Sequence, residues 1–165
     1  GEYRPLSREE AVTRTAAMYK ILDDAGITIM RVGLKSTDII GEGGSINGGT
    51  YHPAFRQLVE GRIARDEIEP HLDRIVDDLR NRYEKSCELT ANHLQGRSLV
   101  NESLNKQRFS RVKVDIFSSL KWFSNVVGNN SENKKYFEKK YPELSIKFRV
   151  DDSLEAAQFR INCNI

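Results

Sequence analysis

An eight-residue apolar run, Ile27–Leu34, constrains the fold of this chain more than any other feature. It follows a segment with helical periodicity, Ser7–Asp24, and a near-continuous apolar run in that place is typical of a parallel strand buried on both faces. Each parallel neighbour would require a crossover of about a dozen residues or more, usually with a helix. No helix–strand unit of that kind adjoins the run downstream. We therefore expect an α/β fragment, the C-terminal part of a larger protein whose other strands precede Gly1.

Clear signals for a helix start, a helix end and a loop flank this run. Ser7 followed by Glu10 is a capping box, in which each side chain accepts a hydrogen bond from a free backbone N–H at the helix start. Gly26 is suited to the left-handed conformation that ends a helix. Residues 41–50 contain five glycines, which predicts a loop without regular structure, at the end of the strand.

Two further helices are expected after the loop. One begins near Tyr51, with Pro53 in its first turn, where a missing N–H costs nothing. The next begins at about Glu69 or Pro70 and carries an apolar face at helical spacing. Residues 92–108 are polar and poorly periodic. The predicted organisation is therefore a first piece at 1–62, a helical linker at 63–105 and a final unit at 106–165.

The final unit has the most regular pattern. Alternating apolar residues predict a strand over Val112–Ile116 and another over Leu144–Val150. Between them, Ser118 or Ser119 caps a first helix, Gly128–Ser131 forms a tight turn, and a second helix runs over Glu132–Tyr141 and stops before a proline. The predicted order is strand, helix, glycine turn, helix, strand, a small α+β unit.

Charge is unevenly distributed along the chain. The sequence is 38% hydrophobic and 30% charged, but residues 106–149 hold eleven basic side chains against four acidic ones. Such a balance favours an anionic partner, or else forms a solvated face. No stretch approaches the ~20 apolar residues of a membrane span, and no leader pattern is present, so we expect no membrane contact and a cytoplasmic protein. Cys87 and Cys163 lack a metal-ligand spacing and are interpreted as two reduced thiols.

Three ordered motifs in residues 1–62 resemble the C-terminal stretch of radical S-adenosylmethionine proteins. They are Tyr3–Val12, then Gly26–Leu34, and then Tyr51–Phe55 with Leu58–Glu60. The similarity is to the branch that includes the Elongator catalytic subunit and proteins described as oxygen-independent coproporphyrinogen III oxidase-like. In that family the catalytic barrel is an open half-ring of parallel strands. The resemblance implies that Ser7–Leu34 supplies the last helix and strand of that barrel.

The resemblance also implies S-adenosylmethionine and a 4Fe-4S cluster in the full-length protein, which would cleave S-adenosylmethionine reductively and use the radical on a substrate. The family binds its cluster through Cys-x-x-x-Cys-x-x-Cys, which leaves the fourth iron open for the cofactor. This chain has only two cysteines. We therefore expect no cofactor, no metal site and no catalytic residue here, and the N-terminal barrel of the same protein as the partner. The chain would be that enzyme's substrate- or partner-recognition portion, and a homodimer through the orphan strand is a further expectation.

Five residues of this first part are candidate ligand contacts by the same resemblance. Arg31, Gly33 and Leu34 would lie beside the cofactor, although Arg31 could equally form an ion pair at the edge of the core. His52 and Phe55 would contact substrate, since they follow the strand's C-terminal end, where α/β barrels place their chemistry. A structural role at the helix start is an equal alternative for His52.

The final unit resembles a KH-type domain, whose Gly-x-x-Gly loop between two helices grips four nucleotides. Here Gly128, Asn129 and Asn130 fit the loop and Lys134 and Lys135 follow, which makes these five the candidate nucleic-acid contacts. Ser131 replaces the second glycine, and a side chain there obstructs the approach of phosphates. The alternative function is thus an RNA-binding module without catalysis, and a third is a tail that only packs or dimerises.

Trp122 is the one candidate for an exposed aromatic that stacks on a base. It lies off the helical stripe of Leu120, Phe123 and Val127, whose aromatic members are better explained by core packing.

Overall fold

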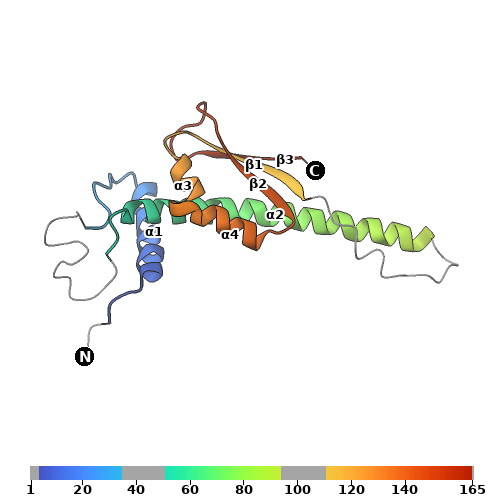
Figure 1. Cartoon of the computed structure of the whole chain (residues 1–165), viewed down its shortest axis with the longest axis horizontal. Coiled ribbons are helices and arrows are strands. Elements are labelled where there is room, and N and C mark those ends of the chain that lie inside the picture. The colour runs from blue at the N-terminus through green and yellow to red at the C-terminus, as the bar shows by residue number, and fades with distance from the viewer. Residues whose placement is uncertain (1–3, 35–50, 94–110, 165) are drawn as a thin grey trace.

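The computed structural model describes residues 4–34, 51–93 and 111–164. Two parts share one long helix (Figure 1): α1 crosses it near its start, and a three-stranded sheet with short helices packs along it further on. The elements are α1 (Arg8–Asp24), α2 (Phe55–His93), β1 (Val112–Ser118), α3 (Phe123–Val127), the 3-10 helix η2 (Asn129–Ser131), α4 (Glu132–Lys140), β2 (Leu144–Val150) and β3 (Phe159–Asn164). No helix in the described ranges combines the length and apolar character needed to span a bilayer.

The predicted capping box is confirmed at the start of α1. The Ser7 backbone N–H donates to Glu10 Oε2 at 2.9 Å, and the Glu10 N–H donates to Ser7 Oγ at 3.2 Å. The helix ends at Asp24, and Gly26 follows with a positive φ of 68°. Ala16 is its one buried residue. The cap and the helix end follow from local sequence alone, whereas the burial depends on α2.

The predicted strand Ile27–Leu34 is wrong for the chain as it stands, because these residues form no strand and pair with none. A strand is held by hydrogen bonds to a neighbouring strand, and the described residues offer this segment no partner. Its apolar side chains remain largely in solvent: Ile27 is 53% exposed, Met30 90% and Leu34 62%. The glycine-rich stretch 41–50 lies outside the described residues.

The two helices predicted after the loop are one continuous helix, α2, which passes through Pro70 and across the predicted boundary at 62. A proline inside a helix removes one backbone hydrogen bond and costs about 3 kcal/mol. Ile68 and Leu72, on either side of it, are fully buried in the core. Burying each stabilises the helix by roughly 1.5–3 kcal/mol, enough to offset the proline. The predicted boundary between the helical linker (63–105) and the final unit (106–165) falls within residues 94–110, which lie outside the described residues.

The predicted order of the final unit, strand, helix, turn, helix, strand, is confirmed, and β3 is an addition that the pattern did not predict. The sheet order is β2-β1-β3, with β1 parallel to β2 and antiparallel to β3. Alternate residues of β1 face the helices, so Val114 and Ile116 are fully buried. They form one core with α2, α3, α4 and β2, to which these residues contribute: Ala64, Ile68, Leu72, Val76, Val126, Phe137, Tyr141, Leu144 and Ile146.

The first helix of this unit is shorter than the sequence predicts. It begins at Phe123 after an N-cap residue, Trp122, that makes no side-chain capping bond. Ser118 and Ser119 are buried instead of capping, and Leu120 is 67% exposed. Trp122 is not an exposed aromatic either, because it packs half-buried against the core.

Candidate functional site

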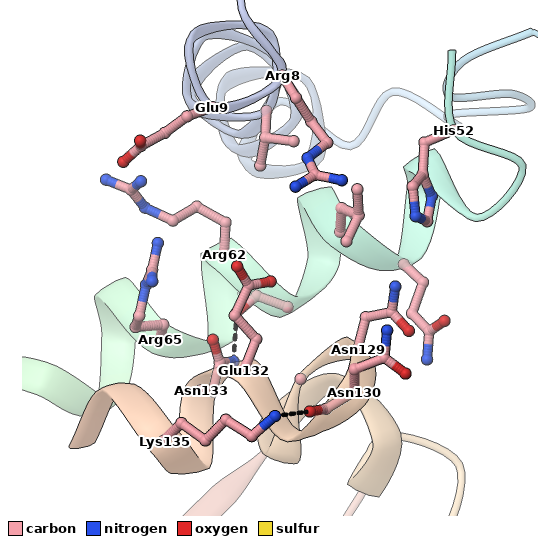
Figure 2. A pocket seen from close by; sticks show the side chains of 15 residues that line it. Arg8, Glu9, His52, Arg62, Arg65, Asn129, Asn130, Glu132, Asn133 and Lys135 are labelled. Atoms are coloured by element: carbon pink, nitrogen blue, oxygen red, sulfur yellow. Dashed lines mark hydrogen bonds between the residues drawn. The ribbon is translucent and has the colours of Figure 1, made fainter. Parts of the chain in front are cut away.

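A cleft of about 470 Å³ lies where three parts of the chain meet: the start of α1, the first turns of α2, and the turn that leads from α3 into α4. Figure 2 shows arginines of α1 and α2 on one side of it, and the asparagines of the turn and Lys135 of α4 on the other. Its walls come from segments more than a hundred positions apart in sequence. Only the tertiary fold creates it.

Asn133 holds the base of this cleft together. The residue is 3% exposed, and its side-chain amide donates to three backbone oxygens: Gly61 O at 2.7 Å, Asn125 O at 3.1 Å and Val126 O at 3.3 Å. A buried amide that satisfies carbonyls on other helices fixes their relative positions. Asn125 extends the connection by donating to Glu60 Oε2 at 3.1 Å.

The turn into α4 requires glycine at its first position. Gly128 has φ +83°, and a Cβ there would lie 2.7 Å from the backbone N of Asn133. Asn130 and Ser131 follow with φ of 51° and 60°, both in the left-handed region that costs most residues energy. Lys135 donates to Asn130 O at 3.0 Å and so braces the turn. The turn is therefore a fixed, strained wall of the cleft.

Three arginines line the opposite side. Arg62 donates through Nε to both Asp66 oxygens, at 2.8 and 2.9 Å, and its second nitrogen donates to Thr13 Oγ1 at 3.1 Å. Arg65 lies over the Tyr136 ring at 4.7 Å. Arg8, from the first turn of α1, points toward the cleft (Figure 2) and has no hydrogen-bond or ion-pair partner within the described ranges.

Two carboxylates, Glu9 and Glu132, also line the cleft. Against them stand Arg8, Arg62, Arg65 and Lys135, so cations outnumber carboxylates two to one among the lining side chains. Since opposing walls bring the cations together in a concave site, the cleft favours an anion.

The structure brings four of the five candidate nucleic-acid contacts to this cleft: Gly128, Asn129, Asn130 and Lys135. Lys134 is not among the lining residues and lies 4.0 Å from Glu138 on the next turn of its own helix.

His52 lines the same cleft, which the sequence did not connect with the turn. Its Nδ1 also accepts a hydrogen bond from the Ala54 N–H at 3.2 Å, close to the start of α2. Both roles left open for His52, structural and ligand-facing, are therefore compatible with its position.

The other candidate contacts of the first part lie away from the cleft. Phe55 packs on Gly33, where a Cβ would be only 2.9 Å from the Phe55 Cβ, and φ at Gly33 is +83°. Arg31 and Leu34 are exposed on either side of that glycine. This contact fixes the end of the apolar segment against the start of α2.

A second group of polar side chains joins α2 to α4, and we call it the α2–α4 network: Glu69, Asp73, Tyr136, Lys140 and Tyr141. Glu69 accepts from Lys140 and, at 2.6 Å, from the Tyr136 hydroxyl. Asp73 accepts from the Tyr141 hydroxyl at 2.7 Å and lies 3.2 Å from Lys140 Nζ. Every charge in the network faces an opposite charge or a donor.

The network shifts the titration of its members. Burial would raise the pKa of Glu69, but hydrogen bonds from Lys140 and Tyr136 outweigh it and leave that pKa lowered. The Tyr141 hydroxyl lowers the pKa of Asp73. The Glu69 carboxylate raises the pKa of Lys140 and of Tyr136, and burial followed by the hydrogen bond to Asp73 raises that of Tyr141. All five groups are thus held in the protonation state that the network needs.

Cys163 lies half-buried on β3, where burial raises the pKa of its thiol. Within the part of the chain that the structure describes, no three histidine, cysteine, aspartate or glutamate side chains group together as metal ligands.

Sequence reasoning missed the three arginines of the cleft. Arg62 and Arg65 are three positions apart and so share a helix face, which was a detectable signal. Nothing in the sequence indicates that Arg8, on another helix, faces them.

A scan against protein-family models and searches of curated proteins and of solved structures found no match to this chain.

Proposed function

We propose that this chain is the C-terminal recognition portion of a radical S-adenosylmethionine enzyme, which docks on an upstream barrel through the apolar segment Ile27–Leu34. The observation that carries the proposal is the exposure of this segment. Its side chains Ile27, Met30 and Leu34 are 53%, 90% and 62% exposed, which is the reverse of what their chemistry favours.

The helix before the segment also exposes apolar side chains. Met18 and Ile21 of α1 are 62% and 67% exposed. Several exposed apolar side chains close together in sequence are typical of an interaction site, and a strand-like sequence without a partner strand is completed by a sheet edge. In the proposed full-length protein that edge belongs to the barrel. The motif resemblance of residues 1–62 supports the same partner.

The cofactor would be held by the barrel and not by this chain. A cluster with an open iron needs three closely spaced cysteines, and Cys87 and Cys163 are 76 positions apart with no third. The residues present therefore do not fit the cluster. Arg31, Gly33 and Leu34 would reach the cofactor region only as part of the docked segment.

Two measurements test the docking. The coding sequence upstream should contain the Cys-x-x-x-Cys-x-x-Cys motif, and its absence would contradict the proposal outright. The upstream polypeptide, produced separately, should bind this chain in titration calorimetry. Met30→Asp should weaken that binding about tenfold or more, because burying one such side chain is worth roughly 1.5–3 kcal/mol.

Leu120→Asp is the matched control for Met30→Asp. Leu120 is 67% exposed but lies in the connection between β1 and α3, so its change should leave docking unaltered. Equal losses from both variants would show that the segment has no special role.

The second candidate function is RNA binding by the turn into α4. Its support is that Gly128, Asn129, Asn130 and Lys135 line one basic cleft. Short single-stranded RNA should then bind with a steep salt dependence, because each neutralised phosphate releases about 0.7 of a counterion. Lys135→Ala should lower affinity and flatten the salt slope by about that amount.

Lys134→Ala serves as the control, since Lys134 does not line the cleft. Fluorescence anisotropy with a short labelled RNA decides. Equal effects of the two lysine changes would point to diffuse surface charge, and no binding at low salt would remove this candidate.

A further inference from the structure

We propose that the cleft between α1, α2 and the turn into α4 is a phosphate-binding site in which Arg8, Arg62 and Arg65 take the anion. The proposal rests on the recognition role proposed above in one respect, since it names the chemical class that this chain would recognise. The site stands on side chains that neither motif resemblance assigned.

Arginine is the side chain best suited to this ligand. Its planar guanidinium presents several N–H donors in a fixed fork and can bind two phosphate oxygens at once. Arg62 is already oriented, because its side chain donates to both carboxylate oxygens of Asp66 and to the hydroxyl of Thr13. Arg65 is likewise held, over the Tyr136 ring. Both therefore lose little side-chain entropy when a ligand binds.

Arg8 supplies a positive charge that remains available to a ligand. It points toward the cleft (Figure 2) and, among the residues that the structure describes, no carboxylate or carbonyl pairs with it. Glu9 and Glu132 oppose an anion, but they are fewer than the cations around them. Arg8 is exposed but lies at a concave site lined by further cations, and such a site attracts an anion more strongly than an open surface does, so Arg8 should dominate the affinity.

The volume of the cleft and the side chains on its wall opposite the arginines indicate a nucleotide-sized ligand. The volume, about 470 Å³, is within the range of small-molecule pockets. The side-chain amides of Asn129 and Asn130 face the arginines across it (Figure 2) and can donate to or accept from a base or sugar. A phosphate at the arginines would leave the rest of the ligand against these amides.

The experiment uses the whole chain and calorimetric titration at low salt. The probes are inorganic phosphate, adenosine 5′-monophosphate, adenosine, and a short single-stranded RNA with a 5′-hydroxyl. Adenosine 5′-monophosphate should bind and adenosine should not. Arg8→Gln should weaken binding about tenfold or more, as expected for loss of a charge-assisted contact. Arg74→Gln, at an exposed arginine on the same helix as Arg62, should change nothing.

A second variant keeps the test independent of any loss in folding. Glu132→Gln removes a carboxylate from the cleft and should tighten phosphate binding several-fold. If only the RNA binds and Arg8→Gln weakens it, the phosphate comes from a nucleic-acid backbone, and the assignment stands. Absence of binding by every phosphate probe, or equal affinity in the parent chain and Arg8→Gln, would overturn it. Neither outcome depends on the barrel, so docking can fail or succeed separately.

Discussion

Helix α2 presents two contrasting charged surfaces to its neighbours within about three turns. Arg62 and Arg65 face the cleft, where cations outnumber carboxylates and Arg8 has no partner in the described ranges. Further along the same helix, Glu69 and Asp73 enter the α2–α4 network, where each charge meets an opposite charge or a donor. Balanced charges hold two helices together, whereas Arg8, which has no partner among the described residues, remains available to a ligand. The network therefore has a structural role, and the cleft is the surface for which we propose recognition.

The largest effect is expected from Gly128→Ala, which breaks the wall of the cleft. A Cβ at Gly128 would meet the Asn133 backbone at 2.7 Å, and φ is +83°. The clash and the backbone strain together should destabilise the chain by about 2–4 kcal/mol. Urea denaturation measures the loss.

Gly26→Ala is the matched control for that change. Gly26 has a φ of +68°, but nothing lies within 4 Å of a Cβ placed there. Only the backbone strain remains, about 1 kcal/mol. Equal losses at Gly26 and Gly128 would mean that close packing against Asn133 does not hold the cleft.

The next largest effect is expected from Glu69→Ala in the network. The change leaves the Tyr136 hydroxyl without its acceptor and removes one of the two carboxylates that face Lys140. Unmade hydrogen bonds of charged groups cost about 1.5–3 kcal/mol in unfolding free energy. Glu132→Ala, which removes an exposed carboxylate of the cleft, should cost less than about 0.5 kcal/mol. If both changes cost the same, the contrast between the two surfaces is wrong.

The network should also make stability depend on pH at both extremes. Glu69 and Asp73 have pKa values lowered below their ordinary 4.5 and 3.8, so their stabilisation is present above those values and is lost as pH falls through the folded pKa. Tyr136 and Tyr141 have pKa values raised above 10.0, so their contribution is present below pH 10 and is lost as pH rises further.

Urea denaturation across pH 3–11 (roughly the span between the carboxyl and tyrosine titrations) tests this dependence. Glu69→Gln should flatten the acid limb, because a glutamine does not titrate. An acid limb that persists undiminished in Glu69→Gln would assign it to carboxylates outside the network.

The smallest effect is expected from Ser131→Gly. Ser131 holds φ at 60°, a region in which glycine lies without strain, so the change should raise the unfolding free energy by about 0.5–1 kcal/mol. It should also remove a side chain next to the cleft and leave phosphate or RNA affinity equal or higher. Destabilisation by this change would show that the serine hydroxyl contributes an interaction beyond the backbone.

Local patterns were enough to predict several features of this chain. The capping box of Ser7 and Glu10 depends only on residues three apart, and the alternation around Val114 predicts a half-buried strand because the strand period is two. The glycine turn at Gly128 follows from the backbone freedom of glycine. These features are fixed within a few residues of each other, and the structure places each of them as the sequence indicates.

The tertiary structure decided the rest, because it depends on which distant surfaces meet. Pro70 indicated a helix boundary, yet burial of Ile68 and Leu72 against the sheet carries α2 through it. The run Ile27–Leu34 has the composition of a strand, but a strand forms only when a neighbour supplies its hydrogen bonds. In the sequence, Arg8 is one of many basic residues. It becomes part of the cleft only because α1 packs across α2. Composition sets what each segment can do, and long-range contacts select which of those possibilities is stable.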